Sequence, residues 1–126
     1  MQPMQTKSSS TCSAGPKLIF SCSGAADVGE LADQTARKLS REGVGKMFCL
    51  AGICGRVSGI LKTTETATSI LAIDGCTLDC AKKSLEEAGF QGFNHLRLTD
   101  FGMEKGKTEV TAENLNKAID KAKVFL

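Results

Sequence analysis

The cysteines of this chain are spaced in a way that could bind a metal ion. Cys76 and Cys80 lie four residues apart, where an apolar run ends and a polar helix is expected to begin. Two cysteines with three residues between them fall within the spacing of zinc ligands on one segment, and residues four apart on a helix share one face. This pair suggests half of a metal site, which needs partners from elsewhere in the chain.

Two further cysteines occupy the equivalent position in earlier parts of the sequence. Cys22 ends the apolar run 18–20, and Cys49 directly follows Met47-Phe48. In a parallel sheet the carboxyl ends of the strands lie along one edge, with neighbouring strands about 4.8 Å apart. Three strand ends would therefore deliver thiols to one place, close enough for turns and side chains to reach a zinc ion.

The elements that must position these thiols alternate between short apolar strands and amphipathic helices. Strands are predicted at 17–22, 45–50, 69–74 and 93–98. Helices are predicted from Asp27 to about Glu42, weakly between 56 and 68, after the strand 69–74 as far as about Ala88, and from Thr111 onward. Uninterrupted apolar strands are typical of a sheet covered on both faces. We therefore predict an α/β fold, a small doubly wound parallel sheet of about four strands in the order 2-1-3-4, with 93–98 at an edge. That order places the strand-end cysteines beside the switch point, where such folds bind ligands.

Several segments together resemble the DGC domain family, whose name describes the Asp-Gly-Cys triplet at 74–76. The matching segments are Cys22 with Asp27-Val28-Gly29, the run 49–53, the run 74–83, and Leu98-Thr99-Asp100-Phe101-Gly102 with Lys105. The resemblance covers about residues 17–124 and implies zinc binding more firmly than any reaction. It implies Cys22, Cys49, Cys76 and Cys80 as the four ligands. The chain departs from the family pattern at Cys54, an additional thiol near Cys49, and at the Thr that follows Cys76.

Composition bounds the remaining possibilities. A chain of 126 residues with 41% apolar content can enclose one core, so we predict one domain at 17–126 after a polar, disordered tail at 1–16, where Cys12 has no role. No apolar run is long enough for a membrane span or a signal sequence, which predicts a soluble, cytoplasmic protein whose thiols stay reduced. The net charge of +2 and the absence of Trp and Tyr indicate no nucleic-acid partner.

Charged residues near the motif are predicted to support the site. Asp74 and Asp79 are expected to cap the following helix or to support the ligands, and Asp27 to cap the first long helix. His95 is expected on the edge strand, away from the carboxyl edge and outside the ligand set. Lys105 and Lys107 are expected to be solvated, although a lysine there could offset the charge of four thiolates around zinc.

Two other classes of function remain open from the residues. The run from Cys49 to Arg56 is similar to the phosphate-binding loop of low-molecular-weight tyrosine phosphatases and arsenate reductases, with Cys49 as the nucleophile, but it has one residue too many between Cys and Arg. Alternatively, Cys76 and Cys80 could exchange electrons or pass on a soft metal, and Cys54 could resolve Cys49. Four thiolates could also hold an iron–sulfur cluster. The reading that we favour is a zinc-binding protein with no identifiable reaction.

Overall fold

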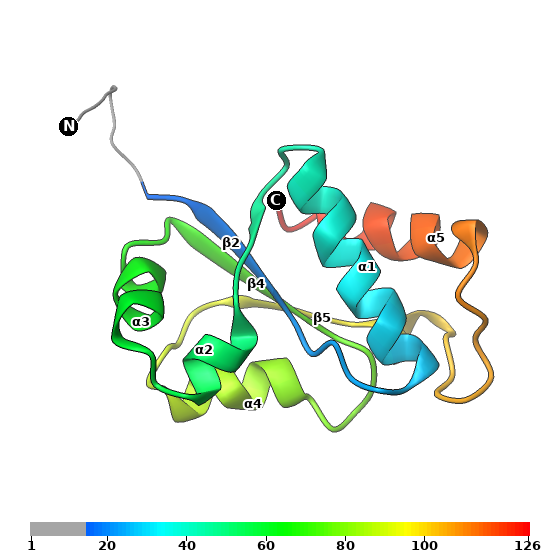
Figure 1. Ribbon diagram of the computed structural model, residues 1–126. Coiled ribbons are helices and arrows are strands. Elements are labelled where there is room, and N and C mark those ends of the chain that lie inside the picture. Colours follow the sequence, from blue (N-terminus) through cyan, green and yellow to red (C-terminus); the bar gives the residue numbers. More distant parts are fainter. Residues whose placement is uncertain (1–14) are drawn as a thin grey trace.

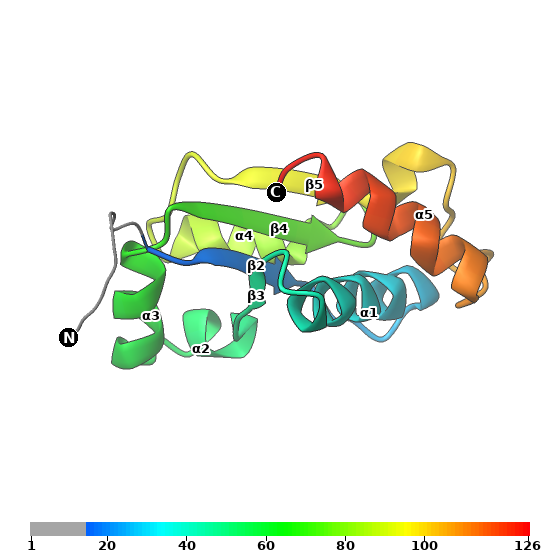
Figure 2. The same cartoon turned by 90° about the horizontal axis from the view of Figure 1, so that it is seen from above.

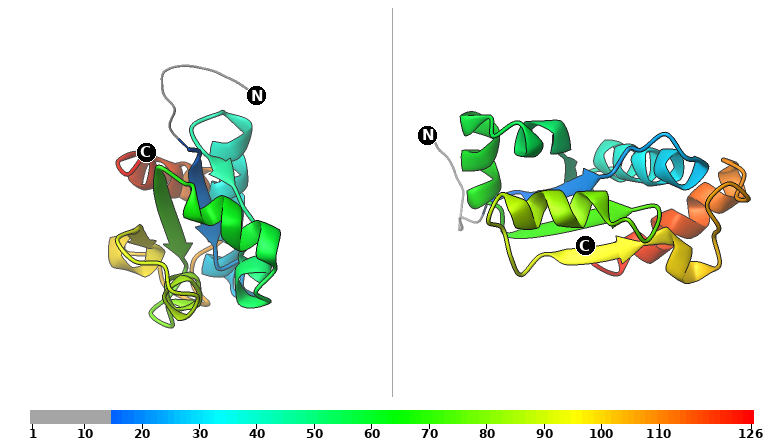
Figure 3. Two further views of the ribbon diagram at one scale, coloured as in Figure 1. Left: turned by 90° about the vertical axis from the view of Figure 1, so that its left-hand side faces the viewer. Right: turned by 90° about the horizontal axis from the view of Figure 1, so that it is seen from below.

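Four parallel strands form one sheet in the order β3-β2-β4-β5. The structure is a computed structural model that describes residues 15–126, so Cys12 and the tail before residue 15 lie outside the described residues. The strands are β2 (Lys17–Ser21), β3 (Lys46–Met47), β4 (Ser69–Asp74) and β5 (Asn94–Arg97). The arrowheads of β2, β4 and β5 point the same way in Figure 3. The predicted α/β class, the strand order 2-1-3-4 and the edge position of the fourth strand are confirmed.

Helices cover both faces of the sheet because side chains along each strand alternate between two apolar clusters. Helices α1 (Asp27–Arg41) and α5 (Ala112–Lys123) lie side by side on one face (Figures 1 and 2), where Ile19 and Leu71 are fully buried. Helices α2 (Leu50–Cys54), α3 (Ser58–Glu65) and α4 (Cys80–Glu87) belong to the other face, where Leu18 and Phe20 pack against Ile53 and Leu85. This two-sided burial holds the strand ends in fixed positions.

The second strand is much shorter than predicted. Instead of a strand at 45–50, β3 comprises only Lys46–Met47, and α2 begins at Leu50. The ladder ends where the Phe48 N–H donates to the Ile19 carbonyl at 2.9 Å, and Cys49 then takes the extended conformation of a helix N-cap. Cys49 therefore starts a helix rather than ending a strand.

The remaining helices end largely as their sequences predict. The weak helix between 56 and 68 is α3, and the C-terminus of α4 is closed by Gly89, whose φ of +95° is the left-handed conformation that glycine favours. Thr111 caps α5 by accepting the Asn114 N–H. Ala26, rather than Asp27, is the N-cap residue of α1, but the Asp27 carboxylate does accept the Val28 N–H of the first turn at 2.8 Å. Between residues 15 and 126, none of the helices has the length and apolar character needed to cross a membrane.

Candidate metal centre

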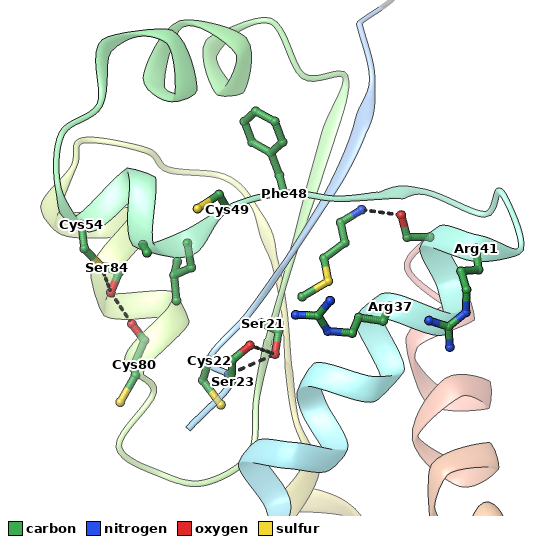
Figure 4. A pocket seen from close by; sticks show the side chains of 14 residues that line it. Ser21, Cys22, Ser23, Arg37, Arg41, Phe48, Cys49, Cys54, Cys80 and Ser84 are labelled. Carbon is green, nitrogen blue, oxygen red and sulfur yellow. Dashed lines mark hydrogen bonds between the residues drawn. The ribbon is translucent and has the colours of Figure 1, made fainter. Parts of the chain in front are cut away.

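A hollow of about 1010 Å³ opens at the carboxyl edge of the sheet, between α1 on one side and α2 and α4 on the other. Four of the five cysteines that the structure describes line it, namely Cys22, Cys49, Cys54 and Cys80 (Figure 4). They come from three separate segments of the chain, because β2, β3 and β4 all end here. The sequence prediction that strand ends bring thiols to one edge is thus reflected in the fold, with Cys54 as an additional member.

Cys22 is the most deeply placed of the thiols in the hollow. Its N–H donates to the Ile73 carbonyl at 3.0 Å, which extends the β2–β4 ladder by one residue. Burial raises the pKa of the Cys22 thiol, and the nearby Asp74 and Cys80 add to this, whereas the N–H groups of Gly24 and Gly75 act in the opposite direction. A Cys22 thiolate is therefore unfavourable until a cation compensates its charge.

Cys49 and Cys54 stand at the two ends of α2. The Cys49 sulfur accepts the Gly52 N–H at 3.3 Å, as expected for an N-cap side chain. The Cys54 thiol lies 3.2 Å from the Ser84 hydroxyl, which itself donates to the Cys80 carbonyl at 2.7 Å. Cys54 is thus linked to α4 through a serine, and both Cys49 and Cys54 are exposed.

Cys76 and Cys80 both lie at the turn between β4 and α4, as predicted, but they do not share one helix face. Only Cys80 is helical, as the first residue of α4, because Asp79 before it takes a left-handed conformation with φ of +56°. Cys76 lies in the preceding turn and packs against the apolar cluster under α1. It does follow Gly75, whose N–H contacts Cys22. Cys76 is thus separated from the helix that Cys80 begins, and it does not line the hollow with the other four thiols.

The sulfurs share the hollow but are not closed around a point. Within residues 15–126, no three cysteine sulfurs lie within 4.8 Å of one another. A tetrahedral zinc site with bonds of about 2.3 Å needs a tighter set. The cysteines stand on turns and helix ends, outside the strands of the sheet, so closure around a metal would involve these segments.

The Asp-Gly-Cys triplet has a clear structural basis. The buried Asp74 carboxylate accepts the N–H groups of Ala81 at 2.7 Å and Lys82 at 3.1 Å, so it caps α4 from seven residues away. A Cβ on Gly75 would lie 2.6 Å from the backbone of Val28, so a side chain cannot fit where this turn packs against α1. Each of these residues holds the cysteine-bearing turn in place, and the capping role predicted for Asp74 is confirmed.

A network of charged side chains continues from Asp74 along the edge strand. His95 Nε2 lies 2.8 Å from Asp74 and 3.6 Å from Asp79. Arg97 binds both oxygens of Asp79, at 2.8 Å and 2.6 Å. Asp79 is the N-cap residue of α4, but its carboxylate pairs with Arg97 instead of accepting a helix N–H, which fits the supporting one of its two predicted roles. His95 does lie on the edge strand, as predicted. Its contact with Asp74, which helps to hold the turn between β4 and α4, was not predicted from the sequence.

The oxygens and nitrogen of Asp74, Asp79 and His95 lie within 4.8 Å of one another and are the kind of group that could hold a cation. However, the oxygens of Asp74 accept helix N–H groups, and those of Asp79 are bound by Arg97. A cation would have to displace these donors. We therefore interpret the network as a brace for the turn that carries Cys76 and Cys80.

The loop that follows β5 lies against α1 rather than against the thiols. Asp27 accepts the N–H groups of Gly106 at 2.8 Å and Thr108 at 3.0 Å, and these bonds lower the pKa of its carboxyl. Lys105 is exposed, and Lys107 is exposed and lies 3.8 Å from Glu104. The two lysines are solvated loop charges, as the simpler of the two predictions states.

Arg56 is turned away from Cys49. Its guanidinium donates to the backbone carbonyls of Ile53 at 2.9 Å and Glu87 at 3.2 Å. In a phosphate-binding loop the arginine must face an anion held above the cysteine. The geometry therefore argues against the phosphatase-like alternative, in agreement with the spacing of the two residues.

Comparison with known proteins identifies the same family as the Asp-Gly-Cys motif does. A model of the DGC domain matches residues 18–122. The chain belongs to the DGC domain family. A relative of this DGC protein is the Anaerobic and virulence modulator AnvM of Pseudomonas aeruginosa, which is 35% identical over 88 residues, or 70% of this chain and 67% of AnvM. No solved structure matches this DGC domain.

The ion pair between Asp79 and Arg97 should make the stability of the fold depend on pH. Arg97 holds the pKa of Asp79 below its ordinary value of 3.8, so the pair stabilises the fold above that value and is lost as the pH falls through the lower pKa of the folded state. We expect the urea midpoint of the wild type to fall more steeply below about pH 4 than that of Asp79→Asn. Equal acid dependence of the two proteins would contradict a stabilising pair.

Proposed function

We propose that this protein binds one zinc ion through cysteine thiolates at the carboxyl edge of its sheet, with Cys22, Cys49, Cys76 and Cys80 as ligands. The observation that carries the proposal is the convergence of thiols from three strand ends on one hollow. Thiolates are soft ligands that favour zinc and similar metals over magnesium or calcium. When bound, zinc would supply positive charge to these thiolates and tie the loops together, since it has no redox chemistry of its own.

Cys22 is the proposed ligand whose ionisation would depend on a bound cation. Cys22 resists ionisation because it is buried beside Asp74 and Cys80, so its thiolate needs a positive charge close by. The braced turn between β4 and α4 supplies two of the proposed ligands, and β2 and the N-cap of α2 supply one each. Cys54 is the competitor of Cys49, because both stand on α2 and both line the hollow.

A binding role agrees better than catalysis with the other observations. Arg56 is engaged with carbonyls, so Cys49 has no oxyanion cradle of the kind that a phosphatase needs. AnvM is named as a modulator rather than as an enzyme, which favours a binding role for this chain as well. We propose a metal-dependent binding protein that acts in the cytoplasm.

The proposal is tested by elemental analysis of the protein purified without added metal. We expect about one zinc ion per chain, as in a structural four-cysteine site. Cobalt substitution should then give the strong sulfur-to-cobalt absorption of a thiolate-rich tetrahedral site. Protein that contains no metal and gives no cobalt absorption would overturn zinc binding, and a coloured protein with iron and sulfide would replace it with a cluster.

A further inference from the structure

The hollow has a second wall, which the proposed zinc site does not use. Arg37 and Arg41 stand one turn apart on α1 and line the hollow across from the thiols (Figure 4). Ser40 and the half-buried Met47 and Phe48 also line this hollow. One side of the hollow is therefore cationic, and the other consists of thiols.

The guanidinium of Arg37 is held in place by the same strand end that carries Cys22. Its Nε donates to Asp33 at 2.7 Å, and Asp33 also accepts the Ser23 hydroxyl at 2.7 Å. Ser23 is fixed in turn, because its N–H and hydroxyl lie 3.1 Å and 3.2 Å from the hydroxyl of the buried Ser21.

This chain of contacts leaves the outer nitrogens of Arg37 directed toward the hollow, as Figure 4 shows. Burial opposes the charge on Asp33, but the hydrogen bonds from Arg37 and Ser23 lower the pKa of its carboxyl, so the pair stays ionised. The arginine is thus an oriented group rather than a free surface charge.

We propose that the hollow binds small thiols that carry a carboxylate, with Arg37 and Arg41 holding the carboxylate while the thiol faces the cysteines, and that such a thiol delivers zinc to this site. The inference rests on the proposed zinc-binding function and names the form in which the metal arrives. A guanidinium binds a carboxylate through two parallel hydrogen bonds, which fixes the ligand's orientation. A hollow of about 1010 Å³ can accommodate a tripeptide-sized molecule.

The delivery step is a ligand exchange without any redox change. The bond between zinc and the carrier sulfur breaks, and a bond between zinc and a cysteine sulfur of this chain forms. The proton of that cysteine goes to the departing carrier, which leaves as a free thiol. The open arrangement of the sulfurs, with no three described cysteines within 4.8 Å, leaves space for a carrier to approach.

A ligand of this class fits both walls at once. A simple anion would use the arginines alone, and a free zinc ion would use the thiols alone and gain nothing from the positive charge opposite. A zinc complex of a carboxylate-bearing thiol has negative groups for Arg37 and Arg41 and a metal for the cysteines. Its attraction to the arginines should weaken with salt, because both residues are exposed.

The test measures zinc transfer to metal-free protein from two carriers. Zinc-loaded glutathione carries carboxylates, and zinc-loaded cysteamine carries none. We expect transfer from glutathione to be about 10-fold slower in the double variant Arg37→Gln/Arg41→Gln than in the wild type at low salt, and transfer from cysteamine to be equal in both. The matched control is Lys38→Gln, which removes a positive charge from the same helix outside the hollow and should behave as the wild type.

The outcomes separate this inference from the zinc site itself. Full zinc uptake by all variants, with equal rates from both carriers, would overturn the inference and leave the zinc site intact. Uptake from no source would overturn the proposed function. In that case a titration of metal-free protein with glutathione, followed by the amide signals of 37–41, still decides the ligand class: shifts that the double variant abolishes would support the binding site, and no shifts would overturn it.

Discussion

Replacing Cys80 by serine is expected to weaken zinc binding by at least about 100-fold, which exceeds the loss typical of a group that only supports a ligand. A serine hydroxyl keeps the shape but does not offer the soft thiolate that zinc favours over neutral oxygen. The same loss is expected for Cys22→Ser, Cys49→Ser and Cys76→Ser. Competition with a chelator of known affinity measures it, and the cobalt spectrum reports how many sulfurs remain.

Cys54→Ser is the matched control, because Cys54 lines the same hollow but lies against Ser84. It should retain zinc, and Cys12→Ser should retain it as well. Full retention in two or more of the four ligand variants would rule out the proposed set. Loss in Cys54→Ser with retention in Cys49→Ser would instead exchange these two residues at the site.

Asp74→Ala should lower the free energy of unfolding by about 2–4 kcal/mol, even in metal-free protein. The substitution removes the acceptor of two helix N–H groups, of which that of Ala81 is buried, and it also leaves His95 without its partner. A charged acceptor at a helix N-terminus also gains from the helix dipole. Urea unfolding of metal-free protein at neutral pH measures the effect without any contribution from zinc.

Two further variants test whether the loss in Asp74→Ala comes from the missing helix cap. Asp74→Asn should lose less than Asp74→Ala, because an amide oxygen can still accept one of the N–H groups. Asp120→Ala, an exposed aspartate on α5, should change stability by no more than about 0.5 kcal/mol. A loss below about 1 kcal/mol in Asp74→Ala would show that the cap contributes little to this fold.

The sequence predicted the sheet well because its signals are local. Apolar runs such as Leu18-Ile19-Phe20 identify buried strands, and right-handed crossovers then leave few possible orders. The same reasoning placed thiols at one edge, and Cys22, Cys49 and Cys80 do line one hollow. Cys76 does not line that hollow, because the left-handed conformation of Asp79 separates its turn from the helix, and no spacing rule reveals such a conformation.

The supporting residues could not be predicted because their partners are distant in the chain. Asp79 meets Arg97 across 18 positions, and Asp74 meets His95 across 21. The early end of β3 was also hidden, since Phe48 and Leu50 look as apolar as strand residues. His95 pairs with Ala72, two residues before Asp74 at the end of β4, and only this register of β4 and β5 makes the contact between His95 and Asp74 foreseeable.

The early end of β3 has a consequence for how copies of this protein avoid one another. A long, flat strand at a sheet edge exposes a row of backbone donors and acceptors that can pair with another chain and start aggregation. Here the edge beside the hollow presents only Lys46–Met47 before the chain turns into α2, and Lys46 places an exposed positive charge on it. The early turn into α2, which brings Cys49 to the hollow, therefore leaves little of this edge on which a neighbouring molecule could add a strand.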